Sequence, residues 1–150
     1  MKAPFLLGRM IFGGFFLYNG IHHLQERKTM AQYTQSKGVP AALSEVAVVG
    51  TGAALIAGGA SILSGVKPKW GALAILGFLG GVSPIMHDFW KHEDPQQRQA
   101  ELINFSKNMA MAGAALALMG VEEPWEASVP IAQPTGMERA RAIGRRLRAA

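Results

Sequence analysis

The chain lacks cysteine altogether, and it lacks charge over two long stretches. Without a thiol, the chain itself can form no disulfide, no thiolate metal site and no dithiol redox centre. Residues 46–66 and 70–86 contain no ionisable side chain. A soluble helix carries polar residues along its outward face, so uncharged stretches of this length indicate helices surrounded by lipid. A chain of 150 residues is too short to enclose several such helices in a water-soluble core.

Four apolar stretches rich in glycine and alanine follow one another along the chain, at residues 4–24, 44–64, 70–87 and 102–121. At roughly 1.5 Å per helical residue, each is about long enough to cross a hydrocarbon layer of about 30 Å. The sequence therefore predicts an all-α fold, an integral membrane four-helix bundle in up-down-up-down order that occupies residues 1–121. The first stretch is interpreted as a retained helix, because no small-residue cleavage site precedes His22 and three more apolar stretches follow.

The first loop is polar but patterned. Met30 and Tyr33 share one face at helical spacing, which predicts a short interfacial helix between the first two spans. Residues 122–150 are interpreted as a proline-punctuated linker and a basic C-terminal tail. Two interpretations of this tail stay open: a basic helix on an anionic membrane surface, or a disordered soluble segment.

The distribution of basic residues bears on the orientation in the membrane. The N-terminus, the second loop and the tail hold nine Lys and Arg, against six in the first and third loops. Because basic residues favour the cytoplasmic side, we expect both termini in the cytoplasm.

Polar side chains gather at alternate ends of the four stretches. In an up-down-up-down bundle, the end of the first helix, the start of the second, the end of the third and the start of the fourth share one membrane face. These ends hold Asn19, His22, His23, Glu45, His87, Asp88, Lys107 and Asn108, whereas the opposite ends offer mainly Arg9, Ser61, Ser64, Lys67 and Lys69.

The first interpretation of this polar cluster is a site for a quinone or another small redox ligand. A quinone carbonyl needs a hydrogen-bond donor, and its ring needs apolar and aromatic walls. The candidate ligand-binding residues are Asn19, His22, His87, Lys107 and Asn108. No residue is predicted to be catalytic. Any activity would be that of an oxidoreductase subunit supplied with electrons by a partner, because no segment indicates a site for flavin, haem or an iron–sulfur cluster.

Two other interpretations of the cluster stay open. In the structural one, the polar groups bind one another, and Glu45 pairs with Lys107. The weaker one is a metal site. The spacing argues against metal, because adjacent histidines on a helix point about 100° apart. The available metal ligands are His22, His23, His87 and His92.

Several short motifs resemble those of DoxX-type membrane proteins, in order and spacing, over residues 4–120. They are Gly8-Arg9, Asn19-Gly20-Ile21-His22-His23-Leu24, Tyr33 before Gly38-Val39-Pro40, Gly58-Gly59, His87-Asp88-Phe89-Trp90 and Asn104-Phe105-x-Lys107-Asn108. The resemblance implies a four-helix protein of the bacterial inner membrane. Some relatives are small subunits of thiosulfate:quinone oxidoreductase, and others are described as membrane partners of redox or oxidative-stress proteins. Relatives often have lysine at the position of His23, so the resemblance implies no chemistry specific to that histidine.

Three functions are therefore expected as alternatives. The first is an accessory or quinone-interacting subunit of a membrane redox system. The second is a non-enzymatic scaffold that anchors a soluble partner, and the third is a small transporter or lipid-handling protein. The expected partners are the lipid bilayer, a soluble or membrane redox protein and a second copy of the chain, but no nucleic acid. The glycine-rich faces make a homo-oligomer plausible.

Overall fold

The computed structural model describes residues 3–125 and 127–129. This part of the chain forms five α-helices and one short 3-10 helix, without a strand, which confirms the predicted all-α fold. The basic tail predicted for the C-terminus lies outside the described residues. The helices are α1 (Ala3–Gln25), α2 (Arg27–Ser36), α3 (Ala41–Ser64), α4 (Pro68–Met86), η1 (Phe89–Lys91) and α5 (Pro95–Met119).

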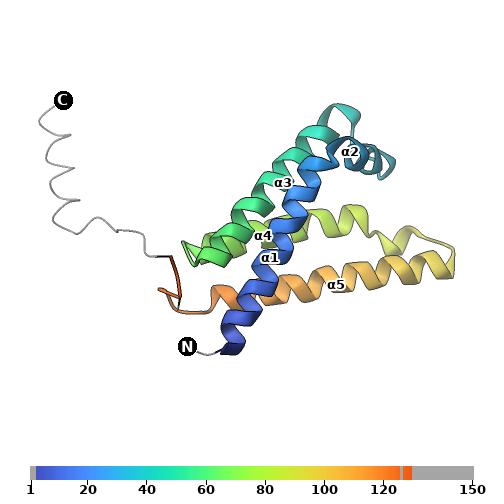
Figure 1. Ribbon diagram of the computed structural model, residues 1–150. Helices are drawn as coiled ribbons and strands as arrows, with labels where there is room; N and C mark the ends of the chain where they lie inside the picture. The colour runs from blue at the N-terminus through green and yellow to red at the C-terminus, as the bar shows by residue number, and fades with distance from the viewer. Residues whose placement is uncertain (1–2, 126, 130–150) are drawn as a thin grey trace, which may run out of the picture.

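The four long helices pack in chain order, α1 against α3, α3 against α4 and α4 against α5. The N-terminus of α1, the α3–α4 turn and the residues after α5 lie at one end of the molecule, here called the basal end (Figure 1). The short helices α2 and η1 lie at the other, here called the open end. The α1–α3 pair and the α4–α5 pair diverge toward the open end (Figure 1). The bundle is therefore tight at its base and spread at the end where the polar residues gather.

Glycines allow the helix backbones of the tight part to touch. A Cβ on Gly59 of α3 would lie 2.5 Å from the backbone nitrogen of Leu17 and 2.6 Å from the carbonyl oxygen of Gly13 on α1. A Cβ on Gly71 of α4 would lie 2.7 Å from the carbonyl oxygen of Gly58 on α3. Any larger residue at these positions forces the helices apart, so glycine sets the spacing of α1, α3 and α4.

Arg9 closes the basal end. Its side chain is buried, with 3% of its surface exposed, and its Nη2 donates hydrogen bonds to the carbonyl oxygens of Leu63 and Ala127, each at 3.0 Å. The guanidinium also lies 5.9 Å from the ring centre of Trp125, which is itself 3% exposed. The packed bundle therefore extends past residue 121, where the sequence analysis placed its end.

The last helix begins earlier than predicted. It starts at Pro95 rather than near residue 102, because the Asp94 carboxylate accepts the backbone N–H groups of Gln96 and Gln97 and Pro95 occupies the first turn. The earlier start places Lys107 midway along α5 instead of at its beginning. The first half of the helix is consequently a polar extension of the open end.

Among the residues that the structure describes, two helices are long and apolar enough to cross a membrane: α3, and α4 with the residues that follow it to Lys91. Four spans were expected. In α1, Arg9, Asn19 and the histidines lower the hydropathy, and in α5 the polar first half has the same effect. Length and composition alone therefore support two of the four expected spans.

Candidate functional site

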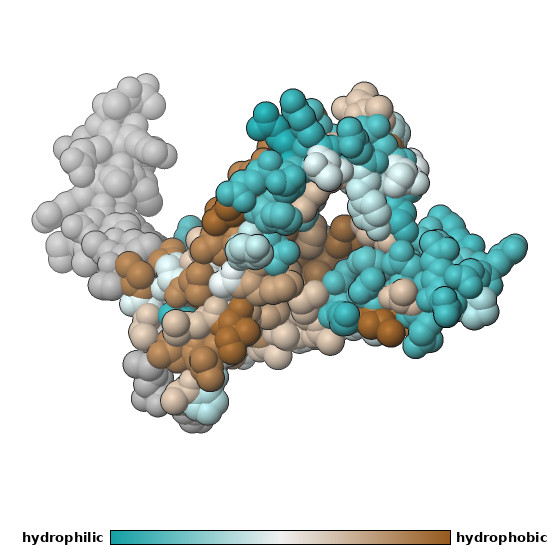
Figure 2. All heavy atoms as spheres, turned by 45° about the vertical axis from the view of Figure 1, so that its right-hand side comes forward, coloured by the Kyte–Doolittle hydropathy of each residue, from teal (hydrophilic) through white to brown (hydrophobic). Residues whose placement is uncertain are grey.

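A cavity of about 590 Å³ lies between the two helix pairs in the half of the bundle near the open end. All five α-helices contribute to its wall, and most of the lining side chains are apolar or aromatic. Figure 2 shows hydrophobic side chains in the hollow between the polar projections of the two pairs. A cavity of this size and character is typical of sites for small organic ligands, which range from about 300 to 1,000 Å³.

Two glycines on α4 keep this cavity open. Gly77 and Gly81 lie one helical turn apart, both line the cavity, and a Cβ on either would meet no atom within 4 Å. Their spacing resembles a helix-packing motif, but no helix of the described part of the chain packs against them. They differ in this from Gly58 and Gly71, which touch a neighbouring helix. On α4, small residues on the cavity side create room for a ligand rather than a helix contact.

Some polar side chains in the cavity wall are bonded to their own helix. Asn19 donates from Nδ2 to the carbonyl oxygen of Phe15 at 2.8 Å, and Thr34 donates to the carbonyl oxygen of Met30 at 2.7 Å. Asn108 differs, since within the described part of the chain its side-chain amide has no hydrogen-bond partner. Its amide is therefore available to a ligand as both a donor and an acceptor.

His23 also lines the cavity, through contacts with α3 and α4. Its Nδ1 lies 3.4 Å from the Thr51 hydroxyl, and its ring packs edge-on against Phe78 with centroids 5.8 Å apart. Thr51 meanwhile donates to the Ala47 carbonyl at 2.8 Å. The ring is thus an aromatic part of the wall, packed between the two helix pairs.

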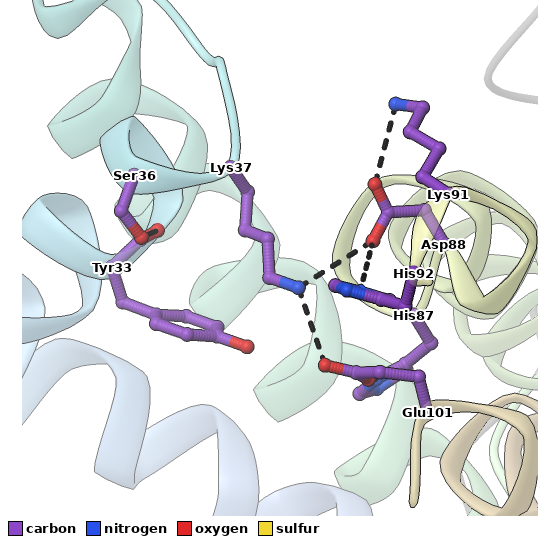
Figure 3. Close-up of polar contacts among 8 residues, drawn as sticks. All are labelled: Tyr33, Ser36, Lys37, His87, Asp88, Lys91, His92 and Glu101. Atoms are coloured by element: carbon purple, nitrogen blue, oxygen red, sulfur yellow. Dashed lines mark hydrogen bonds and ion pairs between the residues drawn. The ribbon is translucent and has the colours of Figure 1, made fainter. Parts of the chain in front are cut away.

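An ion-pair network joins the two helix pairs beside the cavity (Figure 3). We call it the clasp and define it by Lys37, His87, Asp88, His92 and Glu101. Lys37, just after α2, reaches across to Glu101 of α5, with Nζ 3.3 Å from Oε1, and to Asp88 after α4, with Nζ 3.5 Å from Oδ1. His92 Nε2 lies 3.4 Å from the same Asp88 oxygen. The contacts to Asp88 Oδ1 are ion-pair distances rather than aligned hydrogen bonds, since that oxygen has no hydrogen-bond partner within the described residues.

His87 connects the clasp to the cavity. His87 lines the cavity, and its Nδ1 lies 2.8 Å from Oε2 of Glu101. The other oxygen of Glu101 faces Lys37. Lys37, Asp88 and Glu101 have side chains only 13–15% exposed, so water screens these contacts little. A change of charge or position in the clasp therefore acts directly on His87 in the cavity wall.

The clasp shifts the ionisation of its members. Burial acts to raise the pKa of the Glu101 carboxyl, but hydrogen bonds from His87 and Lys37 outweigh it, so the pKa lies below its ordinary value. Burial acts to lower the pKa of the Lys37 ammonium, but the hydrogen bond to Glu101 and the nearby negative charges outweigh it, so the pKa lies above its ordinary value. Both residues lie outside the apolar helical segments, and both stay charged at neutral pH.

The structure brings together three of the five predicted ligand-binding residues. Asn19, His87 and Asn108 come from three different helical regions and line the same cavity. His22 does not, since it is exposed on α1 with its ring stacked on Tyr18 at 6.2 Å between centroids. Lys107 is exposed on α5 and does not line the cavity.

The predicted pair between Glu45 and Lys107 does not form. Glu45 instead lies with Oε1 3.2 Å from Nε of Arg27 on α2, a pair that is about half exposed on both sides. The short helix α2 brings Arg27 to the start of α3, whereas the early start of α5 displaces Lys107 from that end. The sequence alone could not show that Glu45 pairs with Arg27, because Arg27 lies on a separate short helix whose position depends on the fold.

The alternative metal site is not assembled in the part of the chain that the structure describes, where no group of three potential ligands occurs. His22 stacks on Tyr18 and His23 packs on Phe78, whereas His87 and His92 bind different carboxylates. His22 and His23 therefore have separate surroundings, and His87 and His92 belong to the same clasp but contact different carboxylates.

The sequence analysis missed Lys37, Glu101 and the role of Gly77 and Gly81. A signal for Glu101 was present in Asp94-Pro95, since a helix that continues from this start carries Glu101 on α5. Lys37 had no comparable signal. Its partners lie far along the chain, and only the fold brings them within reach.

Within the described residues, a helical bundle with two helices long and apolar enough to cross a membrane, spread at one end around an apolar cavity, is typical of a helical membrane protein. A family model described as DoxX matches residues 5–88, which is more than half of the chain. The chain belongs to the DoxX family. The match covers α1 to α4 and ends at Asp88, so α5 with Glu101 and Asn108 lies beyond it. No curated protein and no solved structure matches the chain.

Proposed function

We propose that this DoxX protein binds a quinone-class molecule from the bilayer and serves as an accessory subunit of a membrane redox system. The observation that carries the proposal is the cavity of about 590 Å³, with largely apolar walls and few polar groups. Quinones combine an apolar body with two polar oxygens. An apolar pocket with a few placed hydrogen-bonding groups is the kind of site that holds such a molecule.

The polar groups at the wall suit a quinone head group. Asn108 offers an unpartnered amide, and His87 offers a ring whose Nδ1 is engaged by Glu101 while Nε2 has no partner within the described residues. Phe15, Phe78 and Tyr33 supply aromatic surface on the same wall. The ring of the ligand would lie among these side chains, and its apolar tail would extend between the two helix pairs toward lipid.

Electrons reach the bound quinone from a partner in this proposal. The chain has no cysteine and so cannot ligate an iron–sulfur cluster through thiolates. A soluble or membrane redox protein would supply the electrons, and this chain would supply the quinone site. Any catalytic role is then that of one subunit of an oxidoreductase.

We further propose four membrane spans, a bacterial inner-membrane location and cytoplasmic termini. The N-terminus of α1 and the basic turn with Lys67 and Lys69 lie together at the basal end (Figure 1). Val129, the last described residue, donates its N–H to Ser64 at the same end, at 2.8 Å. Basic residues favour the cytoplasmic side, so the basal end would face the cytoplasm and the clasp would lie at the opposite face.

Binding of decyl-ubiquinone to the detergent-solubilised full-length protein tests the proposal. We expect saturable binding by the wild type. The double variant Gly77→Leu/Gly81→Leu fills the cavity and should weaken binding at least tenfold. Gly80→Leu is the matched control, because Gly80 lies on the same helix, does not line the cavity and has no atom near its Cβ position. We expect this control to bind like the wild type.

Two outcomes would contradict the proposal. One is unchanged affinity in the filled variant. The other is the absence of saturable binding to the wild type. If that second result came with recovery of a soluble partner from membranes, the non-enzymatic scaffold would become the better account.

A further inference from the structure

The contact with Glu101 determines which ring nitrogen of His87 carries a hydrogen. Nδ1 lies 2.8 Å from Oε2 of Glu101, a hydrogen-bond distance. An ionised carboxylate can only accept hydrogen bonds, so the hydrogen in this contact belongs to Nδ1. In a neutral imidazole the other nitrogen then carries no hydrogen. In this neutral tautomer, Nε2 of His87 is a hydrogen-bond acceptor.

Charge balance in the clasp supports a neutral ring. Lys37 lies between the carboxylates of Glu101 and Asp88, and Lys91 lies 3.2 Å from the second oxygen of Asp88. Two ammonium groups thus compensate two carboxylates without any charge on His87. The pKa of Glu101 lies below its ordinary value, so the carboxylate stays ionised at neutral pH. The network holds Nδ1–H on the Glu101 side and leaves Nε2 without a partner within the described residues.

We propose that the cavity binds the reduced, hydroxyl-bearing form of its ligand, a quinol, in preference to the quinone. This inference rests on the proposed function. A quinol hydroxyl can donate to Nε2 of His87, whereas a quinone carbonyl would face it acceptor to acceptor. Asn108 can donate or accept and so suits both forms. His87 therefore sets the preference, and Glu101 and Lys37 act as positioning residues that hold its tautomer.

The experiment compares decyl-ubiquinone with its quinol, kept reduced under nitrogen, on the full-length protein in detergent. We expect the wild type to bind the quinol about tenfold more tightly, the effect of one additional hydrogen bond of roughly 1 to 1.5 kcal/mol. Glu101→Gln should abolish or reverse this ratio, because a glutamine amide can donate to Nδ1 and allow hydrogen on Nε2. Glu101→Asp retains a carboxylate and should keep the direction of the preference.

His22→Ala is the matched control, since His22 is exposed and does not line the cavity. Its quinol-to-quinone ratio should equal that of the wild type. A second measurement reads the protonation of the His87 ring directly. Nitrogen-15 spectra of histidine-labelled wild type should show one ring protonated at Nδ1 and unprotonated at Nε2, and this signal should vanish in His87→Gln.

Three results would overturn the inference. Equal binding of both forms by the wild type, or an unchanged ratio in Glu101→Gln, would refute the preference while the proposed function stands. A signal with hydrogen on Nε2 of His87 would refute the assigned tautomer. Failure of both forms to bind would instead refute the proposed function, so the two claims are separable.

Discussion

Replacing Gly59 with alanine tests the helix contact on which the fold depends. The added Cβ would lie 2.5 Å from the backbone nitrogen of Leu17 and 2.6 Å from the carbonyl oxygen of Gly13. Alanine favours a helix over glycine by about 1 kcal/mol, but a methyl forced into a packed interface costs about 1–3 kcal/mol. Both nearest atoms belong to backbone, which cannot rotate away. We therefore take the upper end of that cost and expect a net loss of about 2 kcal/mol, roughly thirtyfold in the folding equilibrium.

The assay is denaturant-induced unfolding in detergent micelles, followed by circular dichroism. Gly80→Ala is the control, because no atom lies within 4 Å of a Cβ at that position. This control should be unchanged or more stable by up to about 1 kcal/mol, from helix propensity alone. Adding Leu17→Ala to Gly59→Ala should not restore stability, since the Leu17 atoms in the contact are backbone atoms.

Equal stabilities of Gly59→Ala and Gly80→Ala would refute the close approach of α1 and α3. Rescue by Leu17→Ala would show instead that the obstacle is a side chain, and the spacing of the two helices would have to be revised.

The remaining predictions concern charged residues. The pKa of Glu101 is lowered and that of Lys37 is raised, so the ion pair between them stabilises the fold fully between about pH 5 and 10. The contribution of Glu101 is lost as the pH falls below 4.5 and through the folded-state pKa of this carboxyl. Lys37→Met should therefore lower the melting temperature at pH 7, through a loss of about 2 kcal/mol, and this loss should shrink as the pH falls below 4.5; a loss that stays constant on acidification would contradict the ion pairing. Arg9→Met should speed hydrogen–deuterium exchange in the segment around Ala127 that Arg9 binds, whereas unchanged exchange would show that other contacts hold it. Glu45→Gln and Lys107→Met should each change the free energy of unfolding by less than about 0.5 kcal/mol, and their effects should add in the double variant. A non-additive result would show that Glu45 and Lys107 interact, as the sequence predicted.

The sequence could predict which end of the bundle is polar. Charge-free stretches marked the helices, and their alternating direction placed Asn19, His87 and Asn108 at the same end. The direction in which each side chain points around its helix was harder to predict, because it depends on the exact helix boundaries. An error of seven residues in the start of α5 moved Lys107 to the helix beginning and left Glu101 in a loop.

The cavity itself could not be predicted from residue type. Gly58 and Gly77 are both small residues in apolar helices, yet one touches α4 and the other borders empty space. The difference arises because the two helix pairs diverge, which no local pattern encodes. The clasp has the same origin, since Lys37 meets Asp88 and Glu101 only across the gap between the pairs.

Native mass spectrometry of the protein extracted gently from membranes tests the central claim most directly. The wild type and Gly80→Leu should each retain a quinone-class molecule, and Gly77→Leu/Gly81→Leu should emerge without one. A wild type without any quinone, or a filled variant that retains as much as the wild type, would contradict the assignment of the cavity.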